Sequence, residues 1–118
     1  MDNPNIAVLV DYGGTIFQNF GWIAKTVGYE GYIRKVDSQI SVQDVVSDIN
    51  HLNPNVALIA HHWGVTSRDG KGLELIAALN AQQQPPVMYL LSNDPVTETA
   101  TPAGVQGTLY LPNIETIV

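Results

Sequence analysis

The chain has 118 residues, the length of one domain, which we expect to span residues 1–118. Of these residues 45% are hydrophobic and only 14% are charged, against a usual share of about 25%, which excludes a disordered chain. Its formal net charge is −6 at pH 7, and no Lys or Arg follows Lys71. A nucleic-acid surface needs clustered cations to neutralise phosphates, so we expect no nucleic-acid partner. The absence of cysteine excludes disulfides, thiolate metal sites and a cysteine nucleophile.

Residues 1–5 begin no signal-peptide pattern, and no apolar run in the chain approaches the ~20 residues of a membrane span, so we expect a cytoplasmic protein without a membrane partner.

Residues 6–10 are continuously apolar and predict a strand buried on both faces. A helix is expected to start with Thr15 as its cap and to stop at Gly28. Residues 31–36 predict a second strand, whose polarity suits the edge of a sheet. The helix expected between Thr15 and Gly28 has an apolar stripe that consists of Ile16, Phe20, Ile23, Ala24 and Val27.

A second helix is expected after Ser41, where Ser-Val-Gln-Asp resembles a capping box, and Asn53-Pro54-Asn55 ends it. Residues 56–60 predict a third buried strand. A third helix is expected from about residue 72 to residue 83. The apolar stripes of the two helices consist of Val42, Val45, Val46, Ile49 and Leu52 in the first, and Leu73, Ile76 and Leu79 in the second.

The C-terminal part predicts two further strands, over residues 87–91 and 107–111. Residues 97–105 are only weakly helical because Pro102 interrupts them, and residues 112–118 leave room for one or two helical turns. Strands that alternate with amphipathic helices predict a parallel sheet covered on both faces. We therefore expect an α/β fold of the flavodoxin-like type: a three-layer αβα sandwich with a five-stranded sheet in the order 2-1-3-4-5 and a last helix that is short or missing.

In this topology a site gathers at the carboxyl ends of strands one, three and four. Those ends are Asp11-Tyr12-Gly13-Gly14, His61-His62-Trp63-Gly64 and Ser92-Asn93-Asp94.

Four segments make the chain resemble a response-regulator receiver domain. Residues 6–12 are similar to the first strand of that family, which ends in an acidic pair, and residues 86–91 are similar to its fourth strand. Residues 69–76 (Asp-Gly-Lys-Gly-Leu-Glu-Leu-Ile) resemble the loop and helix that follow the phosphorylation strand. Residues 104–112 resemble the Gly-x-x-Gly segment that normally closes with Lys-Pro. The resemblance covers nearly the whole chain and implies the receiver fold.

The resemblance also implies a set of site residues, from which this chain departs. The acidic pair that holds Mg²⁺ falls on Asp11, which matches, and on Tyr12, which does not. The phosphoacceptor aspartate falls on His61 and the anchoring lysine falls on Leu111. The Ser/Thr position falls on Ser92, or by a strict count one residue earlier.

Aspartyl phosphorylation needs a carboxylate nucleophile, a divalent cation and a cation that holds the phosphorylated state. We therefore expect a degenerate pseudo-receiver that is not phosphorylated, holds no metal or cofactor, and signals through a protein partner or as a homodimer. Residues 11–14 and 52–59 also resemble class I glutamine amidotransferases, but that activity requires a cysteine nucleophile, which is absent. No enzymatic activity is therefore expected.

Residues at the same sheet edge keep an alternative function open. Gly13 and Gly14 precede a predicted helix, where they either form a tight turn or cradle an anion through backbone N–H groups. A small-ligand sensor or an enzyme could instead use Asp11, His61 and Ser92 at the strand ends.

The His61-His62-Trp63 segment has two interpretations. On a strand, His61 and His62 point to opposite faces and cannot bind one metal, whereas in a loop they could. The alternative is a pair of hydrogen-bonded histidines at the loop edge. Trp63 is a packing residue if it is buried and an interaction residue if it is exposed.

Overall fold

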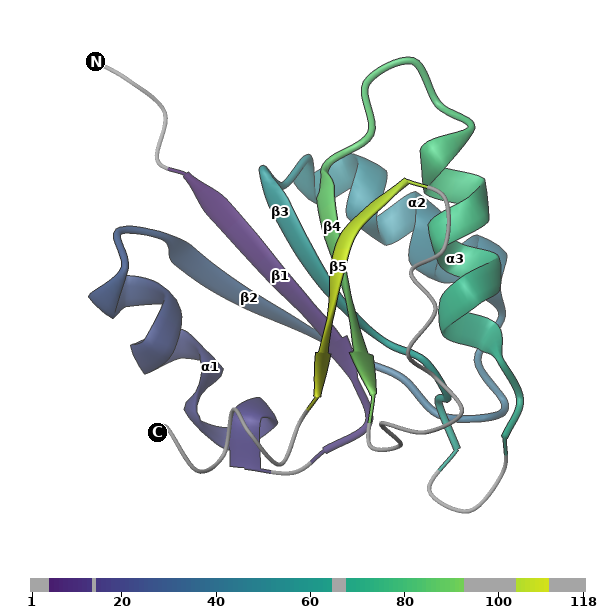
Figure 1. Cartoon of the computed structure of the whole chain (residues 1–118), viewed down its shortest axis with the longest axis horizontal. Coiled ribbons are helices and arrows are strands. Elements are labelled where there is room, and N and C mark those ends of the chain that lie inside the picture. Colours follow the sequence, from purple (N-terminus) through teal and green to yellow (C-terminus); the bar gives the residue numbers. More distant parts are fainter. Residues whose placement is uncertain (1–4, 14, 65–67, 93–103, 111–118) are drawn as a thin grey trace.

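The computed structural model describes residues 5–13, 15–64, 68–92 and 104–110. Within them, five strands form one parallel sheet in the order β2-β1-β3-β4-β5, with helices on both of its faces (Figure 1). The order and the fold class are those that the sequence predicts. In chain order the elements are β1 (Ile6–Asp11), α1 (Thr15–Thr26), β2 (Glu30–Lys35), α2 (Val42–Leu52), β3 (Val56–Ala60), α3 (Lys71–Asn80), β4 (Val87–Ser92) and β5 (Val105–Tyr110).

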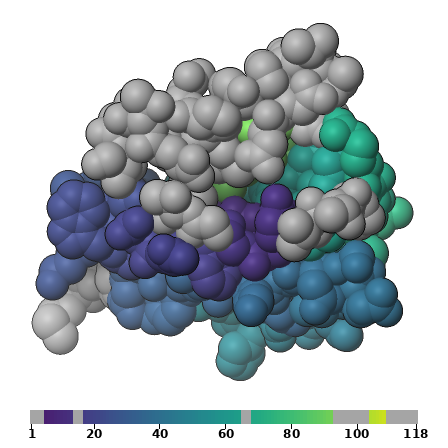
Figure 2. Space-filling model, turned by 90° about the horizontal axis from the view of Figure 1, so that it is seen from below, coloured from purple at the N-terminus to yellow at the C-terminus, as the bar shows by residue number. Residues whose placement is uncertain are grey.

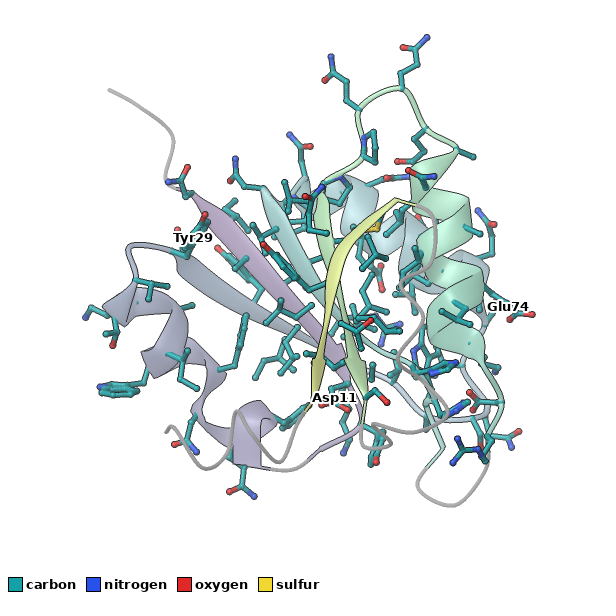
Figure 3. The ribbon with its side chains drawn as sticks, in the orientation of Figure 1. Asp11, Tyr29 and Glu74 are labelled. Carbon is teal, nitrogen blue, oxygen red and sulfur yellow. The ribbon has the colours of Figure 1, made fainter. Side chains whose placement is uncertain are left out.

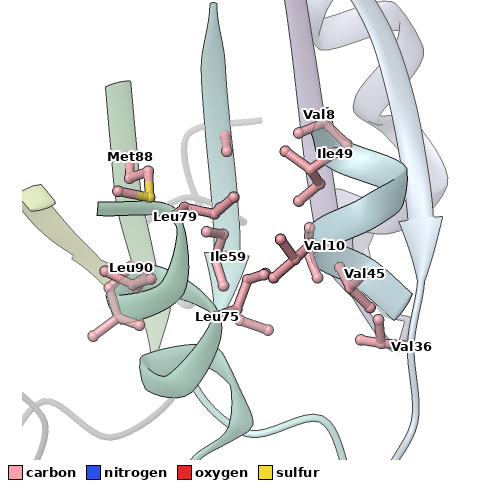
Figure 4. Close-up of a cluster of buried hydrophobic side chains, with 14 of the residues drawn as sticks. Val8, Val10, Val36, Val45, Ile49, Ile59, Leu75, Leu79, Met88 and Leu90 are labelled. Atoms are coloured by element: carbon pink, nitrogen blue, oxygen red, sulfur yellow. The ribbon is translucent and has the colours of Figure 1, made fainter. Parts of the chain in front are cut away.

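The three central strands are apolar on both faces because both faces are covered. Val8 and Val10 of β1 belong to the larger core cluster, which also contains residues of α2 and α3 (Figure 4). Ala7 and Leu9, which alternate with them, belong to a second cluster with residues of α1. The sheet is therefore the middle layer, with α1 on one face and α2 and α3 on the other.

The ends of α1 and α2 follow from local chemistry. Ser41 caps α2, since its Oγ accepts a hydrogen bond from the Gln43 N–H at 3.1 Å. Asn53 terminates that helix in the left-handed region, with φ of 53°. Gly28, with φ of 89°, follows α1 in the same region. The caps at Ser41 and Asn53 confirm the limits that the sequence predicts for α2. The helix α1 begins with Thr15 itself and ends at Thr26, two residues before Gly28.

Three predicted features are wrong. The third helix ends at Asn80 rather than near residue 83, since the Gln82 N–H turns back to the Leu79 carbonyl oxygen at 3.1 Å and closes a tight turn. Val27 is exposed because α1 ends one residue before it, so the helical stripe does not extend that far. Val105 opens β5 instead of ending a helix.

The remaining residues of the weak helix predicted before β5, and the helical turns predicted over residues 112–118, lie outside the described part of the chain. No helix within the described ranges has the length and apolar character needed to cross a membrane.

Candidate functional site

The carboxyl ends of β1, β3 and β4 lie at one edge of the sheet, as the topology predicts. The His61 N–H donates to the Leu91 carbonyl oxygen at 3.0 Å, which continues the β3–β4 register and sets His61 level with Ser92. Asp11 ends β1 one residue beyond the pair of Val10 with Ile59. In Figure 2, which views the molecule from this edge, the residues around the end of β1 reach the surface near the middle.

Asp11 is a buried carboxylic acid, with 1% of its surface exposed (Figure 3). Its Oδ1 accepts a hydrogen bond from the Tyr12 N–H at 2.7 Å. Its Oδ2 has no hydrogen-bond partner among the described residues. Burial raises the pKa of Asp11 to about 6, although the backbone N–H groups of Tyr12 and Gly13 oppose this rise. The carboxyl therefore changes charge close to neutral pH.

Strand alternation separates the predicted site residues across the sheet. Asp11 lies on the α1 face, because it alternates with Val10 and follows the direction of Leu9. Ser92, which is also buried, lies on the opposite face, in line with Leu90. The three strand ends lie at one edge of the sheet, but the side chains of Asp11 and Ser92 lie on opposite faces of it.

His61 and His62 stack on each other, with ring centroids 4.0 Å apart and ring planes 15° apart. Because β3 ends at Ala60, both residues belong to the following loop, so the opposite-face rule for strands does not apply. The lone pair of an imidazole nitrogen lies in the ring plane, so two nearly parallel rings do not converge on one ion. Within the described ranges, no group of three His, Cys, Asp or Glu residues is placed to hold a metal.

The His62 ring also has a defined hydrogen bond. Its Nδ1 accepts from the Gly70 N–H at 2.9 Å, so the neutral imidazole carries its proton on Nε2. This bond joins the two sides of the loop between β3 and α3. His62 is therefore a hydrogen-bonded residue of the loop.

Asp69 closes the same loop; it opens the segment 69–76 of the receiver resemblance, but it is not among the predicted site residues. Oδ1 accepts from the N–H groups of Trp63 and Lys71 at 3.0 and 3.1 Å, and Oδ2 accepts from the Gly64 N–H at 3.1 Å. The sequence signal for this role is an Asp one residue before the glycine that caps α3.

Trp63 is fully buried in the larger core cluster, and its Nε1 donates to the Ala60 carbonyl oxygen at 3.2 Å. The hypothesis that Trp63 contacts a partner or ligand is therefore wrong, because a side chain without exposed surface cannot do so. Its packing interpretation is the correct one. Trp63 holds the loop that carries the histidines against the core.

The other predicted site residues divide into two groups. Tyr12 and Gly13 are partly buried beside Asp11, and the backbone N–H groups of both residues oppose the rise of its pKa. The anion cradle at Gly13 stays a prediction. Gly14 and Leu111 lie outside the described residues.

No protein-family model matches the sequence, and no curated protein does. Among solved structures, the chain is similar to the response regulator receiver domain (CheY-like) from Methylobacillus flagellatus, at 15% identity over 98% of this chain and 100% of that one, with a TM-score of 0.68. It is similar to the signal receiver domain of a LuxO repressor protein from Vibrio parahaemolyticus, at 12% identity over 98% and 87% of the two chains, with a TM-score of 0.66.

The chain is also similar to a response regulator receiver protein from Burkholderia phymatum, at 18% identity over 96% of this chain and 91% of that one, with a TM-score of 0.60. At identities this low, the similarity establishes the fold alone. The resemblance to receiver domains is thereby confirmed as a shared fold along nearly the whole chain.

Proposed function

We propose that this chain is a pseudo-receiver: a cytoplasmic signalling domain of two-component type, spanning residues 1–118, that is not phosphorylated and is not an enzyme. It acts through contacts with a protein partner or with a second copy, and it binds neither nucleic acid nor membranes. The receiver fold supports a signalling role. The acidic balance of the chain, with 11 acidic and 5 basic residues, supports the exclusion of nucleic acid.

One observation carries the proposal. His61 follows β3 directly, at the strand end where the resemblance puts the phosphoacceptor aspartate. Acyl phosphate formation requires a carboxylate oxygen that attacks phosphorus. An imidazole stacked on a second imidazole does not supply that nucleophile.

The residues present also do not fit the Mg²⁺ ion that receiver domains hold. Magnesium takes oxygen ligands in an octahedral arrangement, usually carboxylates together with substrate phosphates. Asp11 is the single carboxylate among the matched positions, since Tyr12 and His61 occupy the other two. Imidazole nitrogen suits transition metals better than magnesium. The matched positions therefore do not supply the ligand set of a magnesium site.

The direct test is incubation with acetyl phosphate and Mg²⁺ followed by intact mass measurement, with a phosphorylatable receiver domain in a parallel reaction as the control. The proposal expects no adduct of about 80 Da, the mass of one phosphoryl group, on this chain. A stable adduct would overturn it. An adduct that disappears in Asp11→Asn would assign the phosphate to that carboxyl.

A second candidate, a small-ligand sensor or an enzyme, is supported by the buried Oδ2 of Asp11, which lacks a partner among the described residues. A ligand donor that reaches this oxygen would restore its missing hydrogen bond. Thermal unfolding with a panel of nucleotides, metabolites and divalent cations tests this candidate. A rise in Tm that Asp11→Asn abolishes would support it, and equal Tm values throughout the panel would contradict it.

A further inference from the structure

We propose that two copies of this chain associate through the outer edge of β2, which pairs antiparallel with β2 of the second copy and makes one continuous ten-stranded sheet. The inference rests on the proposed function, for which it names both the partner and the surface. It deepens that function without involving the strand ends at Asp11 and His61.

The backbone of β2 is arranged for such pairing. β2 is the terminal strand in the order of the sheet (Figure 1). The N–H groups of Glu30 and Val36 donate to carbonyl oxygens on the β1 side at 2.8 and 3.0 Å. Since successive residues of a strand turn their N–H groups to opposite sides, Gly31, Ile33 and Lys35 turn theirs away from β1. No strand among the described residues pairs with that side.

Symmetry limits the register. A two-fold axis perpendicular to the sheet keeps each side chain on its own face, so opposed residues must be an even number of positions apart. If the axis passes beside Tyr32, this residue lies opposite Tyr32 of the second copy. Gly31 then faces Ile33 of the second copy, and both have outward N–H and C=O groups that exchange hydrogen bonds. Glu30 faces Arg34 of the second copy.

The side chains favour this register. The Tyr32 hydroxyl donates a hydrogen bond to the Glu30 carboxylate, and Arg34 Nε forms an ion pair with Asp48 of α2 at 2.7 Å. These contacts place Glu30, Tyr32 and Arg34 in one row on the α2 face of the sheet. In the dimer, Glu30, Tyr32 and Arg34 of one copy lie opposite Arg34, Tyr32 and Glu30 of the second copy. Opposite charges are therefore paired at both ends of the row.

Other registers lose this complementarity. With the axis at Ile33, Tyr32 faces Arg34 and Glu30 faces Val36, and with the axis at Gly31, Glu30 faces Tyr32. Neither pairs the two charges. In addition, Tyr32 is 39% exposed and Ile33 is 43% exposed, which is apolar surface that the second strand would cover.

The first experiment measures molar mass by light scattering over a concentration series. The wild-type chain is expected to approach twice its 12.8 kDa mass. Glu30→Lys places like charges opposite Arg34 and should raise the dimer dissociation constant at least about tenfold. Glu74→Lys is the matched control: it makes the same charge change at an exposed position of α3, on the far side of the molecule from Tyr29 and β2 (Figure 3), and should leave the dimer intact.

The second experiment tests the register in a chain without natural cysteine. Two opposed residues of a non-hydrogen-bonded antiparallel pair have Cα atoms about 4.5 Å apart, within reach of a disulfide. Tyr32→Cys should therefore form a covalent dimer on mild oxidation. In this register residue 34 lies roughly 13 Å from residue 34 of the second copy, so Arg34→Cys should not form a covalent dimer.

A wild-type chain that stays monomeric at all concentrations would overturn the β2 dimer and leave the pseudo-receiver proposal standing, since the phosphorylation test decides that separately. A dimer that survives Glu30→Lys, or one that Glu74→Lys disrupts equally, would overturn the assignment to β2. Equal cross-linking of Tyr32→Cys and Arg34→Cys would overturn the register. Circular dichroism of each variant confirms that it is folded, so that loss of the dimer reports on the edge.

Discussion

The Gly72 N–H donates a hydrogen bond to the His61 carbonyl oxygen at 2.9 Å, so the first turn of α3 lies directly against the backbone that leaves β3. A Cβ at residue 72 would lie 1.9 Å from the carbonyl oxygen of Ala60 and 2.8 Å from that of His61. The approach of α3 to the candidate site therefore depends on the absence of a side chain at this position.

Gly72→Ala should destabilise the protein by about 3 kcal/mol or more, because a rigid backbone cannot yield to the added methyl group. Gly21→Ala is the matched control: Gly21 lies within α1, and a Cβ there would meet nothing within 4 Å. It should stabilise the protein by about 0.5–1 kcal/mol through helix propensity. Urea unfolding of both variants measures the difference, and equal free energies of unfolding would contradict the close contact.

Asp69→Ala should cost about 2 kcal/mol of stability, because the N–H groups of Trp63, Gly64 and Lys71 lose their common acceptor. Asp48→Ala removes one carboxylate from an exposed ion pair with Arg34 and should cost less than about 1 kcal/mol. Urea unfolding checks both values. A smaller loss for Asp69→Ala than for Asp48→Ala would mean that Asp69 does not hold the loop.

Asp11→Asn should stabilise the protein near neutral pH, since the pKa of the buried carboxyl is raised to about 6. A carboxyl with a raised folded-state pKa binds its proton more tightly in the native state. Stability is therefore lost as pH rises through the window from 3.8 to about 6 and is regained below it. The destabilisation above this window amounts to at most about 3 kcal/mol.

The measurable quantity is the difference in unfolding free energy between Asp11→Asn and wild type, which cancels the titration of the other groups. The difference should be about 2 kcal/mol larger at pH 7.5 than at pH 4.5. A constant difference for Asp11→Asn would contradict a raised pKa.

The two tryptophans should give opposite fluorescence behaviour. Trp63 is fully buried, whereas Trp22 is 67% exposed on α1. Trp22→Phe leaves Trp63 as the reporter, whose emission should be blue-shifted and resistant to iodide quenching. Trp63→Phe leaves Trp22, whose emission should be red-shifted and readily quenched. If Trp63 were quenched as strongly as Trp22, its place in the core would be wrong.

Much of the fold can be predicted because its signals are local. The apolar runs of β1, β3 and β4 and the stripe of α2 each reflect burial of a single element, and the caps at Ser41 and Asn53 are short-range hydrogen-bonding patterns. The limits of α3 are less predictable, because the turn after Asn80 is set by competing backbone hydrogen bonds.

Some features of the candidate site can likewise be predicted from the sequence, and others cannot. The residue types at its positions, such as Tyr12 beside Asp11 and His61 after β3, are matters of sequence alone, and they carry the proposal that phosphate chemistry is lost. The stacking of His61 on His62 cannot be predicted from the sequence alone, because it depends on whether β3 ends at Ala60 or one residue later.

The sequence by itself thus determined the alternation of strands with helices, the burial of the central strands on both faces and the departures from the receiver pattern, because periodicity and residue type act within a single element. Only the tertiary structure decided that Trp63 is core, that Asp69 closes the loop, and that the Asp11 carboxyl is desolvated with a raised pKa. Burial and hydrogen-bond geometry are properties of segments brought together from distant parts of the chain, and no local pattern records them.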